Sequence, residues 1–136
     1  PRLNLDIHFA AGNFLRNCLN GEKIIIKGDG TPFRSYLYAD DLIEWLFAII
    51  AKGEKGCIYN VGSPEAVSIR EFACEMALHF SPEPAVEVMQ TPPREAVPAR
   101  YVPDVSRIRR ELGVRMKFSL SEAIEACKTF HAEKQV

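Results

Sequence analysis

The most informative segment of the sequence spans residues 28–41 and reads GDGTPFRSYLYADD. It opens on a glycine-rich turn, runs through aromatic residues around Arg34, and ends on two aspartates. The β-branched run before the turn predicts a strand over residues 23–27, and the residues after it predict a second strand over 33–38. Asp40 or Asp41 is then expected to cap a helix that closes before Gly53. Read as a catalytic pair, the two aspartates are less convincing, because neighbours at a helix start point in different directions.

Outside this segment, helical spacing of apolar residues predicts four more helices, over residues 9–20, 69–80, 104–112 and 119–132. Capping-box patterns at 68–71 (SIRE) and 119–122 (SLSE) mark two of the starts, and Asp104 is expected to cap a third. Gly21 and Gly113 are expected to end the helices before them. Buried strands are predicted over residues 57–61 and 85–89, whereas four prolines exclude regular structure from residues 91–103. The fold class is therefore mixed α/β with few strands.

The helix after Asp41 is expected to have one apolar face, made of Leu42, Trp45, Leu46, Ile49 and Ile50.

The composition is that of an ordinary globular protein. The chain has 136 residues, a net charge of −1 and 47% hydrophobic residues, which excludes disorder. Because the charges are nearly balanced, the protein has no long-range electric field that would attract a nucleic acid or an anionic membrane. A bound anion must therefore be held by a few local residues. The longest apolar stretch, residues 42–51, is too short to span a bilayer, and no export signal is visible. The chain is therefore predicted to be cytoplasmic, without nucleic-acid or membrane partners.

The four cysteines are predicted to be reduced, because none of them has CxxC spacing. Cys18, Cys74 and Cys127 fall on apolar helix faces, and Cys57 opens an apolar strand pattern. No metal site is predicted, because His8, His79 and His131 are scattered along the chain without ligand spacing.

Templates for several enzyme classes are missing from the sequence. It contains no GxGxxG after a strand, no GxxxxGK[ST], no HExxH and no GxSxG. No catalytic residue is therefore predicted in this chain.

Three arginines are the candidates for binding an anion. Arg34 lies among aromatic residues beside the glycine-rich turn, where it either makes a structural pair or presents its fork to a phosphate. Arg94 and Arg100 lie in the proline-stiffened segment, whose fixed backbone could aim both at the same anion. For these two, the composition favours the alternative of solvated surface arginines.

A set of short segments, taken in order, carries a resemblance that covers nearly the whole chain. They are LNGE at 19–22, GDGT at 28–31, RSYLY at 34–38, DDL at 40–42, YNVGS at 59–63, SIRE at 68–71, Arg94, DVS at 104–106 and LG at 112–113. In this order they resemble the C-terminal part of the NAD-dependent nucleotide-sugar epimerase/dehydratase family, the extended short-chain dehydrogenases. The pattern is most similar to the dTDP-glucose 4,6-dehydratases and their relatives in bacterial surface-polysaccharide synthesis. Pro1-Arg2 resembles the end of the YGPR segment, where the cofactor domain of the family ends and the substrate domain begins.

The resemblance implies a chemistry that this chain does not carry by itself. Such dehydratases, which are lyases, oxidise the hexose C4 hydroxyl with NAD, eliminate water across C5 and C6, and return the hydride. The glycine-rich cofactor loop and the catalytic TyrxxxLys of the family precede the region that this chain resembles. NAD is therefore expected to be bound by an N-terminal domain outside this chain, whose own role is to hold the nucleoside diphosphate-sugar.

The resemblance also implies which residues hold that substrate. Arg34 and Arg94 fall on the arginines that grip the diphosphate, Asn60 lies near the nucleotide, and Ile25 and Lys27 fall where a strand backbone meets the base. We expect the guanidinium groups of Arg34 and Arg94 to face one cleft within roughly 10 Å, the span of a diphosphate gripped from two sides. For Asn60 the alternative is a strand-end residue that bonds its own backbone.

One departure from the family pattern concerns the first helix. Family members often carry a polar or basic residue near its start, where this chain has Phe9-Ala10-Ala11. His8 is a candidate substitute for that residue.

The expected domain organisation is a single C-terminal nucleotide-sugar-binding domain over residues 1–136, lacking most of the Rossmann domain. The first residue is Pro1 rather than methionine, which predicts a piece of a longer chain that is inactive alone. Alternative functions are a UDP-sugar epimerase or decarboxylase fragment, a non-catalytic nucleotide-sugar-binding module, or a structural remnant that binds no nucleotide-sugar. Apolar faces around Trp45 and Ile58 would then lack a partner, so a homo-oligomer is expected.

Overall fold

A computed structural model describes residues 9–95 and 97–133 of the chain. The elements, in order, are α1 (Ala10–Leu19), β1 (Ile24–Ile26), β2 (Phe33–Arg34), α2 (Ala39–Lys52), β3 (Val67–Ser68), α3 (Ile69–Leu78), β4 (Val86–Val88), β5 (Arg100–Tyr101), α4 (Ser106–Leu112) and α5 (Leu120–Ala132). The mixed α/β class predicted from the sequence is confirmed. Within the described ranges, no helix is long and apolar enough to cross a membrane.

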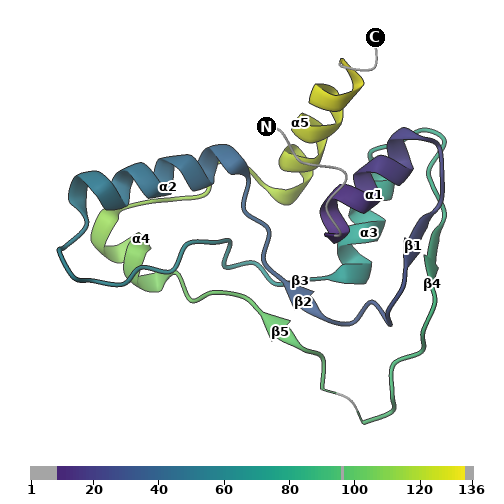
Figure 1. Cartoon of the computed structure of the whole chain (residues 1–136), viewed down its shortest axis with the longest axis horizontal. Helices are drawn as coiled ribbons and strands as arrows, with labels where there is room; N and C mark the ends of the chain where they lie inside the picture. The colour runs from purple at the N-terminus through teal and green to yellow at the C-terminus, as the bar shows by residue number, and fades with distance from the viewer. Residues whose placement is uncertain (1–8, 96, 134–136) are drawn as a thin grey trace.

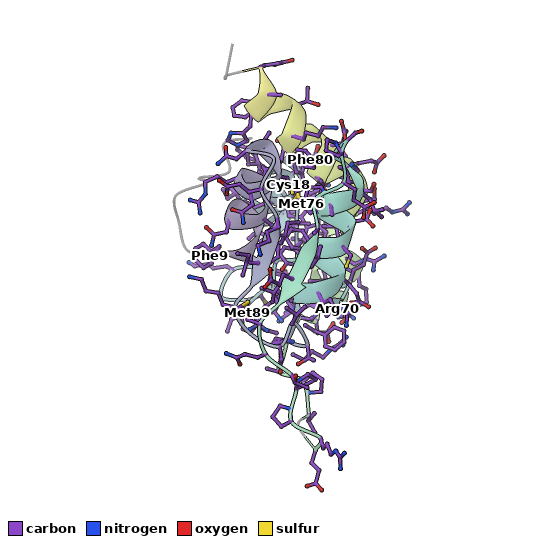
Figure 2. The ribbon with its side chains drawn as sticks, turned by 90° about the vertical axis from the view of Figure 1, so that its right-hand side faces the viewer. Phe9, Cys18, Arg70, Met76, Phe80 and Met89 are labelled. Carbon is purple, nitrogen blue, oxygen red and sulfur yellow. The ribbon has the colours of Figure 1, made fainter. Side chains whose placement is uncertain are left out.

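Two hydrophobic cores lie at opposite ends of the molecule (Figure 1). The first is enclosed by α1, α3 and α5 against the parallel pair β1–β4, with Ile24 and Ile26 turned inward. Cys18 and Met76 meet inside it, between α1 and α3, while Phe9 remains 71% exposed at its edge (Figure 2). The second core is smaller and lies between α2 and α4, centred on Trp45.

A short three-stranded sheet, in the order β3–β2–β5, joins the two cores. In it β2 pairs antiparallel with β3 and parallel with β5. Beside the sheet, the hydroxyl of Ser35 donates to the carbonyl of Ser63 (2.8 Å) and accepts from the Ser63 N–H (3.0 Å). Gly62 packs against the same junction, since a Cβ there would lie 2.5 Å from Cγ of Pro103.

Four helix ends predicted from local patterns are confirmed, at Ser68, Ser119, Gly21 and Gly113. Both capping boxes form, at Ser68 for α3 and at Ser119 for α5. Gly21 and Gly113 adopt φ values of 70° and 69°, the left-handed conformation that glycine reaches without a steric penalty. The predicted cap at Asp104 is wrong, because the N-cap of α4 is Val105, without a side-chain cap bond. Asp104 lies one residue earlier and accepts a hydrogen bond from the Ser106 N–H at 2.8 Å.

The predicted cap at Asp40 or Asp41 is wrong. The N-cap of α2 is Tyr38, without a side-chain hydrogen bond. Asp41 is fully buried and accepts hydrogen bonds from the backbone N–H groups of Lys117 (3.0 and 3.2 Å) and Phe118 (3.2 Å). The carboxylate therefore fastens the start of α2 to the segment that leads into α5.

Three strand predictions need correction. The strand expected over 33–38 is only the two residues of β2, because Ser35 leaves the ladder to bond Ser63. Residues 57–61 form no strand, and Ile58 is 81% exposed, since no other described strand lies beside them. The proline-rich segment, expected to be irregular, contributes β5, which pairs with β2 through two residues and so needs no long pattern.

The apolar face of α2 is largely exposed. Trp45 alone of the five predicted residues is buried, with its indole N–H donating to the Arg115 carbonyl at 3.2 Å. Leu42 and Leu46 are 38% and 45% exposed, and Ile50 is 79% exposed. Neighbouring Ile43 and Phe47 are exposed as well, at 51% and 66%. Most of this face has no partner among the described residues.

Candidate functional site

Arg34 occupies the middle strand of the junction sheet and is half-buried. Its Nη1 donates to the carbonyl of Phe33 at 2.8 Å. Among the residues described, no carboxylate forms an ion pair with this guanidinium. A half-buried, unpaired arginine retains its charge and most of its N–H donors for an anion.

Two tyrosines accompany Arg34, and sequence reasoning missed both as site residues. Strand register pairs Arg34 with Val67 on β3 and with Tyr101 on β5, which places the three side chains on one face. Tyr101 is 79% exposed on that face. Burial raises the pKa of Tyr36 to about 12, and the positive charge of Arg34 partly opposes that rise. The phenol of Tyr36 therefore lies near the guanidinium, while its ring stacks on Phe72 at 4.1 Å.

The side chain of Arg100 lies on the opposite face of the sheet. It pairs in register with Phe33, and its guanidinium carbon lies 5.6 Å from the centre of that ring. Because residues 33 and 34 point to opposite sides of β2, Arg100 and Arg34 do not share a face. Arg100 therefore does not share an anion with Arg34, and it is exposed, as the favoured alternative of a surface arginine predicts.

Arg94 lies in an exposed turn of the connection between β4 and β5. Figure 1 shows this connection projecting away from both cores and returning at β5. The clamp of Arg34 with Arg94 stays a prediction.

The remaining predicted residues lie in separate elements. Ile25 is 40% exposed in the middle of β1, on the face opposite the buried Ile24 and Ile26, and Lys27 follows the strand and is exposed. Asn60 is exposed and donates from Nδ2 to the Asp104 carbonyl at 3.0 Å, which ties residues 57–61 to the start of α4. The alternative of a bond to its own backbone is not what this hydrogen bond shows, because its acceptor is a distant backbone carbonyl. His8 lies outside the described residues.

An apolar cavity of about 350 Å³ lies between the first core and the chain that leaves β2. Its walls come from α1, α3, α5 and residues 35–39, and include Leu15, Phe72, Ile124 and Tyr36. Tyr36 therefore contacts both this cavity and the surroundings of Arg34. Carbon dominates the lining, so the cavity suits an apolar group rather than a phosphate.

The described residues do not fit a dinucleotide cofactor. A pyrophosphate-binding turn needs a strand, a glycine-rich loop and a helix whose N-terminus meets the phosphates. The glycine-rich turn at 28–31 follows β1 but leads into β2, and Asp29 there accepts from the N–H and hydroxyl of Thr31, each at 2.9 Å. No group of three or more potential metal ligands occurs within the described ranges.

Residues 8–62 match the model of the NAD dependent epimerase/dehydratase family. This region contains α1, β1, β2 and α2, and therefore both the glycine-rich turn and Arg34. UDP-glucuronic acid decarboxylase 6 of Arabidopsis thaliana is 28% identical over 124 residues, which are 91% of this chain and 35% of the relative. The chain thus spans only 27–36% of the length of the curated relatives that it matches over 91% of its own length.

Solved structures show the same fold. UDP-N-acetylglucosamine 4-epimerase from Bacillus cereus superposes with a TM-score of 0.80 at 19% identity, over 93% of this chain and 44% of that one. UDP-glucuronic acid 4-epimerase from Bacillus cereus, in complex with NAD, gives a TM-score of 0.70 at 27% identity, over 93% and 37%. dTDP-glucose 4,6-dehydratase from Bacillus anthracis gives 0.76, but at 16% identity, over 93% and 40%. The fold of this chain is therefore that of one part of such epimerases and dehydratases.

Proposed function

We propose that this chain is the substrate-binding part of an NAD-dependent enzyme that modifies a nucleoside diphosphate-sugar. The observation that carries the proposal is Arg34, a half-buried arginine without a carboxylate partner among the described residues, inside the region that matches the family model. Its guanidinium would bind the diphosphate through charge-assisted hydrogen bonds, and Tyr101 would border the same anion.

The other predicted residues complete the proposed site. Arg94 would approach the diphosphate from the loop between β4 and β5, and Asn60 would face the nucleotide with the part of its amide not bonded to Asp104. Ile25 and Lys27 would border the base from the exposed face of β1. We propose a uracil base, because the curated relatives matched over most of this chain are named for UDP-sugars. Decarboxylation, epimerisation and dehydration remain open among the reactions of such enzymes.

The catalytic groups and NAD would belong to a part of the protein outside residues 1–136. The exposed face of α2 supports this division, because Ile43, Phe47 and Ile50 have no apolar cover within the described chain. Residues 57–61 form no strand within the described chain, and Ile58 is exposed. We propose that the cofactor domain covers both, and that a second copy covers them when that domain is missing.

The test is calorimetric titration of the chain with UDP. Arg34→Ala should weaken binding by about 2 kcal/mol, roughly 30-fold, and Arg34→Lys should recover only part of it, since a point charge lacks the fork. The control is Arg70→Ala, which removes an exposed arginine from the first turn of α3. Equal affinity of Arg34→Ala and the parent would overturn the proposal.

A parallel titration with dTDP tests the base. UDP binding at least tenfold tighter than dTDP would support the UDP-sugar assignment, and the reverse order would favour the dTDP-glucose dehydratase pattern.

A further inference from the structure

The segment from Arg100 to Arg115 concentrates positive charge on a protein that is slightly acidic as a whole. It holds five arginines and two carboxylates, a net charge of +3, whereas the complete chain carries −1. It comprises β5, the loop after it, and α4 with its following residues. In Figure 1, β5 lies near the middle of the molecule beside β2, and α4 lies below α2 at one end.

Both carboxylates of this segment are already engaged. Glu111 accepts from Arg107 Nε at 3.1 Å and from Arg110 Nη2 at 3.4 Å. The Asp104 carboxylate accepts from the Ser106 N–H, and this bond lowers the pKa of Asp104.

Three arginines of the segment, Arg100, Arg109 and Arg115, have no carboxylate partner among the residues that the structure describes. All three are exposed. Five cations elsewhere or nearby do find carboxylates, namely Lys23, Arg107, Arg110, Lys117 and Lys128. Three other arginines, Arg34, Arg70 and Arg94, also have no carboxylate partner among the described residues, but they lie in separate parts of the fold. Those of this segment instead line adjoining hollows.

Two adjoining hollows bring these arginines together. One, of about 360 Å³, is lined by Arg100, Asp104 and Arg109, and the other, of about 420 Å³, by Arg109, Arg110 and Arg115. Arg109 and Ser106 line both. The hollows therefore form one basic groove along α4, which we call the α4 groove.

We propose that the α4 groove binds a small linear polyphosphate, a ligand with two or more linked phosphate groups. Arginine forks match phosphate oxygens, and Arg109 between the hollows can bridge neighbouring phosphates while Arg100 and Arg115 hold the ends. A single phosphate would contact only one hollow. Because salt screens each exposed charge, a ligand whose linked phosphates contact several arginines at once should bind more tightly than a single phosphate. The overall charge of −1 does not favour a long nucleic acid. Because Arg100 lies on the sheet face opposite Arg34, this site is separate from the proposed substrate site.

Calorimetry with tripolyphosphate and orthophosphate tests this proposal in an Arg34→Ala background, where the proposed substrate site is disabled. Tripolyphosphate should bind at least tenfold tighter than orthophosphate. The double variant Arg109→Ala/Arg115→Ala should weaken tripolyphosphate binding at least tenfold. Neither arginine side chain forms a hydrogen bond within the described structure, so the double variant should fold normally. An unfolding midpoint equal to that of the parent would check this.

The control is Lys52→Ala/Lys55→Ala, which removes two exposed cations near the end of α2 and should change the affinity less than twofold. An equal loss in this control would mean that bulk charge alone attracts the ligand and would overturn the proposal. The absence of tripolyphosphate binding would also overturn it, as would a short DNA duplex that binds more tightly through the same two arginines.

Discussion

Replacement of Asp41 by alanine should destabilise the protein more than any exposed substitution near it. The carboxylate is fully buried and accepts from two backbone N–H groups, those of Lys117 and Phe118, at 3.0–3.2 Å. Hydrogen bonds to a charged acceptor contribute about 1.5–3 kcal/mol each, and a buried N–H without an acceptor costs a further 1–3 kcal/mol. The carboxylate's own desolvation penalty disappears with it, so the net loss should be about 3 kcal/mol.

Thermal unfolding followed by circular dichroism provides the assay. A loss of about 3 kcal/mol corresponds to a midpoint lower by roughly 10 °C for a chain of this size. Asp41→Asn keeps one oxygen acceptor and should lose about half as much. The matched control is Asp40→Ala, because Asp40 is its exposed neighbour in the first turn of α2. If Asp41→Ala unfolds within 2 °C of Asp40→Ala, the reasoning about the buried carboxylate is refuted.

Three further predictions concern acid stability, thiol reactivity and association. Hydrogen bonds in its capping box lower the pKa of Glu71 in the folded state. Ionised Glu71 therefore stabilises the native state above its unfolded-state pKa of about 4.3, and this stabilisation is lost as the pH falls through the folded-state pKa. Glu71→Gln should thus flatten the fall in unfolding midpoint between pH 5 and 3; an unchanged slope would contradict this. Burial raises the pKa of Cys18 to about 11, so iodoacetamide at pH 8 should alkylate exposed Cys74 first by mass spectrometry, and faster modification of Cys18 would show an open core. Sedimentation should show the parent chain associating at millimolar concentration and Phe47→Glu/Ile50→Glu monomeric, whereas a monomeric parent would remove the basis for the proposed interface on α2.

The sequence predicted helix ends well, because the information for them is local. The capping boxes at Ser68 and Ser119 need only four consecutive residues, and Gly21 and Gly113 act through their own backbone conformation. Asp41 could not be assigned in the same way, because its partners lie 76 and 77 residues away. Two aspartates before an apolar helix indicate a cap, and this local pattern is the same whether or not a distant backbone donates hydrogen bonds to one of the carboxylates.

The strands and the candidate site show the same limit. A strand over residues 57–61 was predicted from apolar content, but a strand also needs a neighbour, and no described strand provides one. Arg34 was found from its setting beside a glycine-rich turn, whereas Tyr101 was missed because a two-residue strand leaves no pattern. The opposite orientations of Arg34 and Arg100 follow from pairing register, which is a property of the fold.

The central claim, that Arg34 holds the diphosphate of a nucleotide-sugar, is tested most directly by titrating UDP into ¹⁵N-labelled protein and following the Arg34 Nε–H signal by NMR. A bound diphosphate should shift this signal and the Tyr101 amide together, with one common dissociation constant. Both shifts should persist in the Arg109→Ala/Arg115→Ala variant, in which the α4 groove is disabled. An unmoved Arg34 signal at saturating UDP, with shifts confined to another part of the chain, would contradict the account.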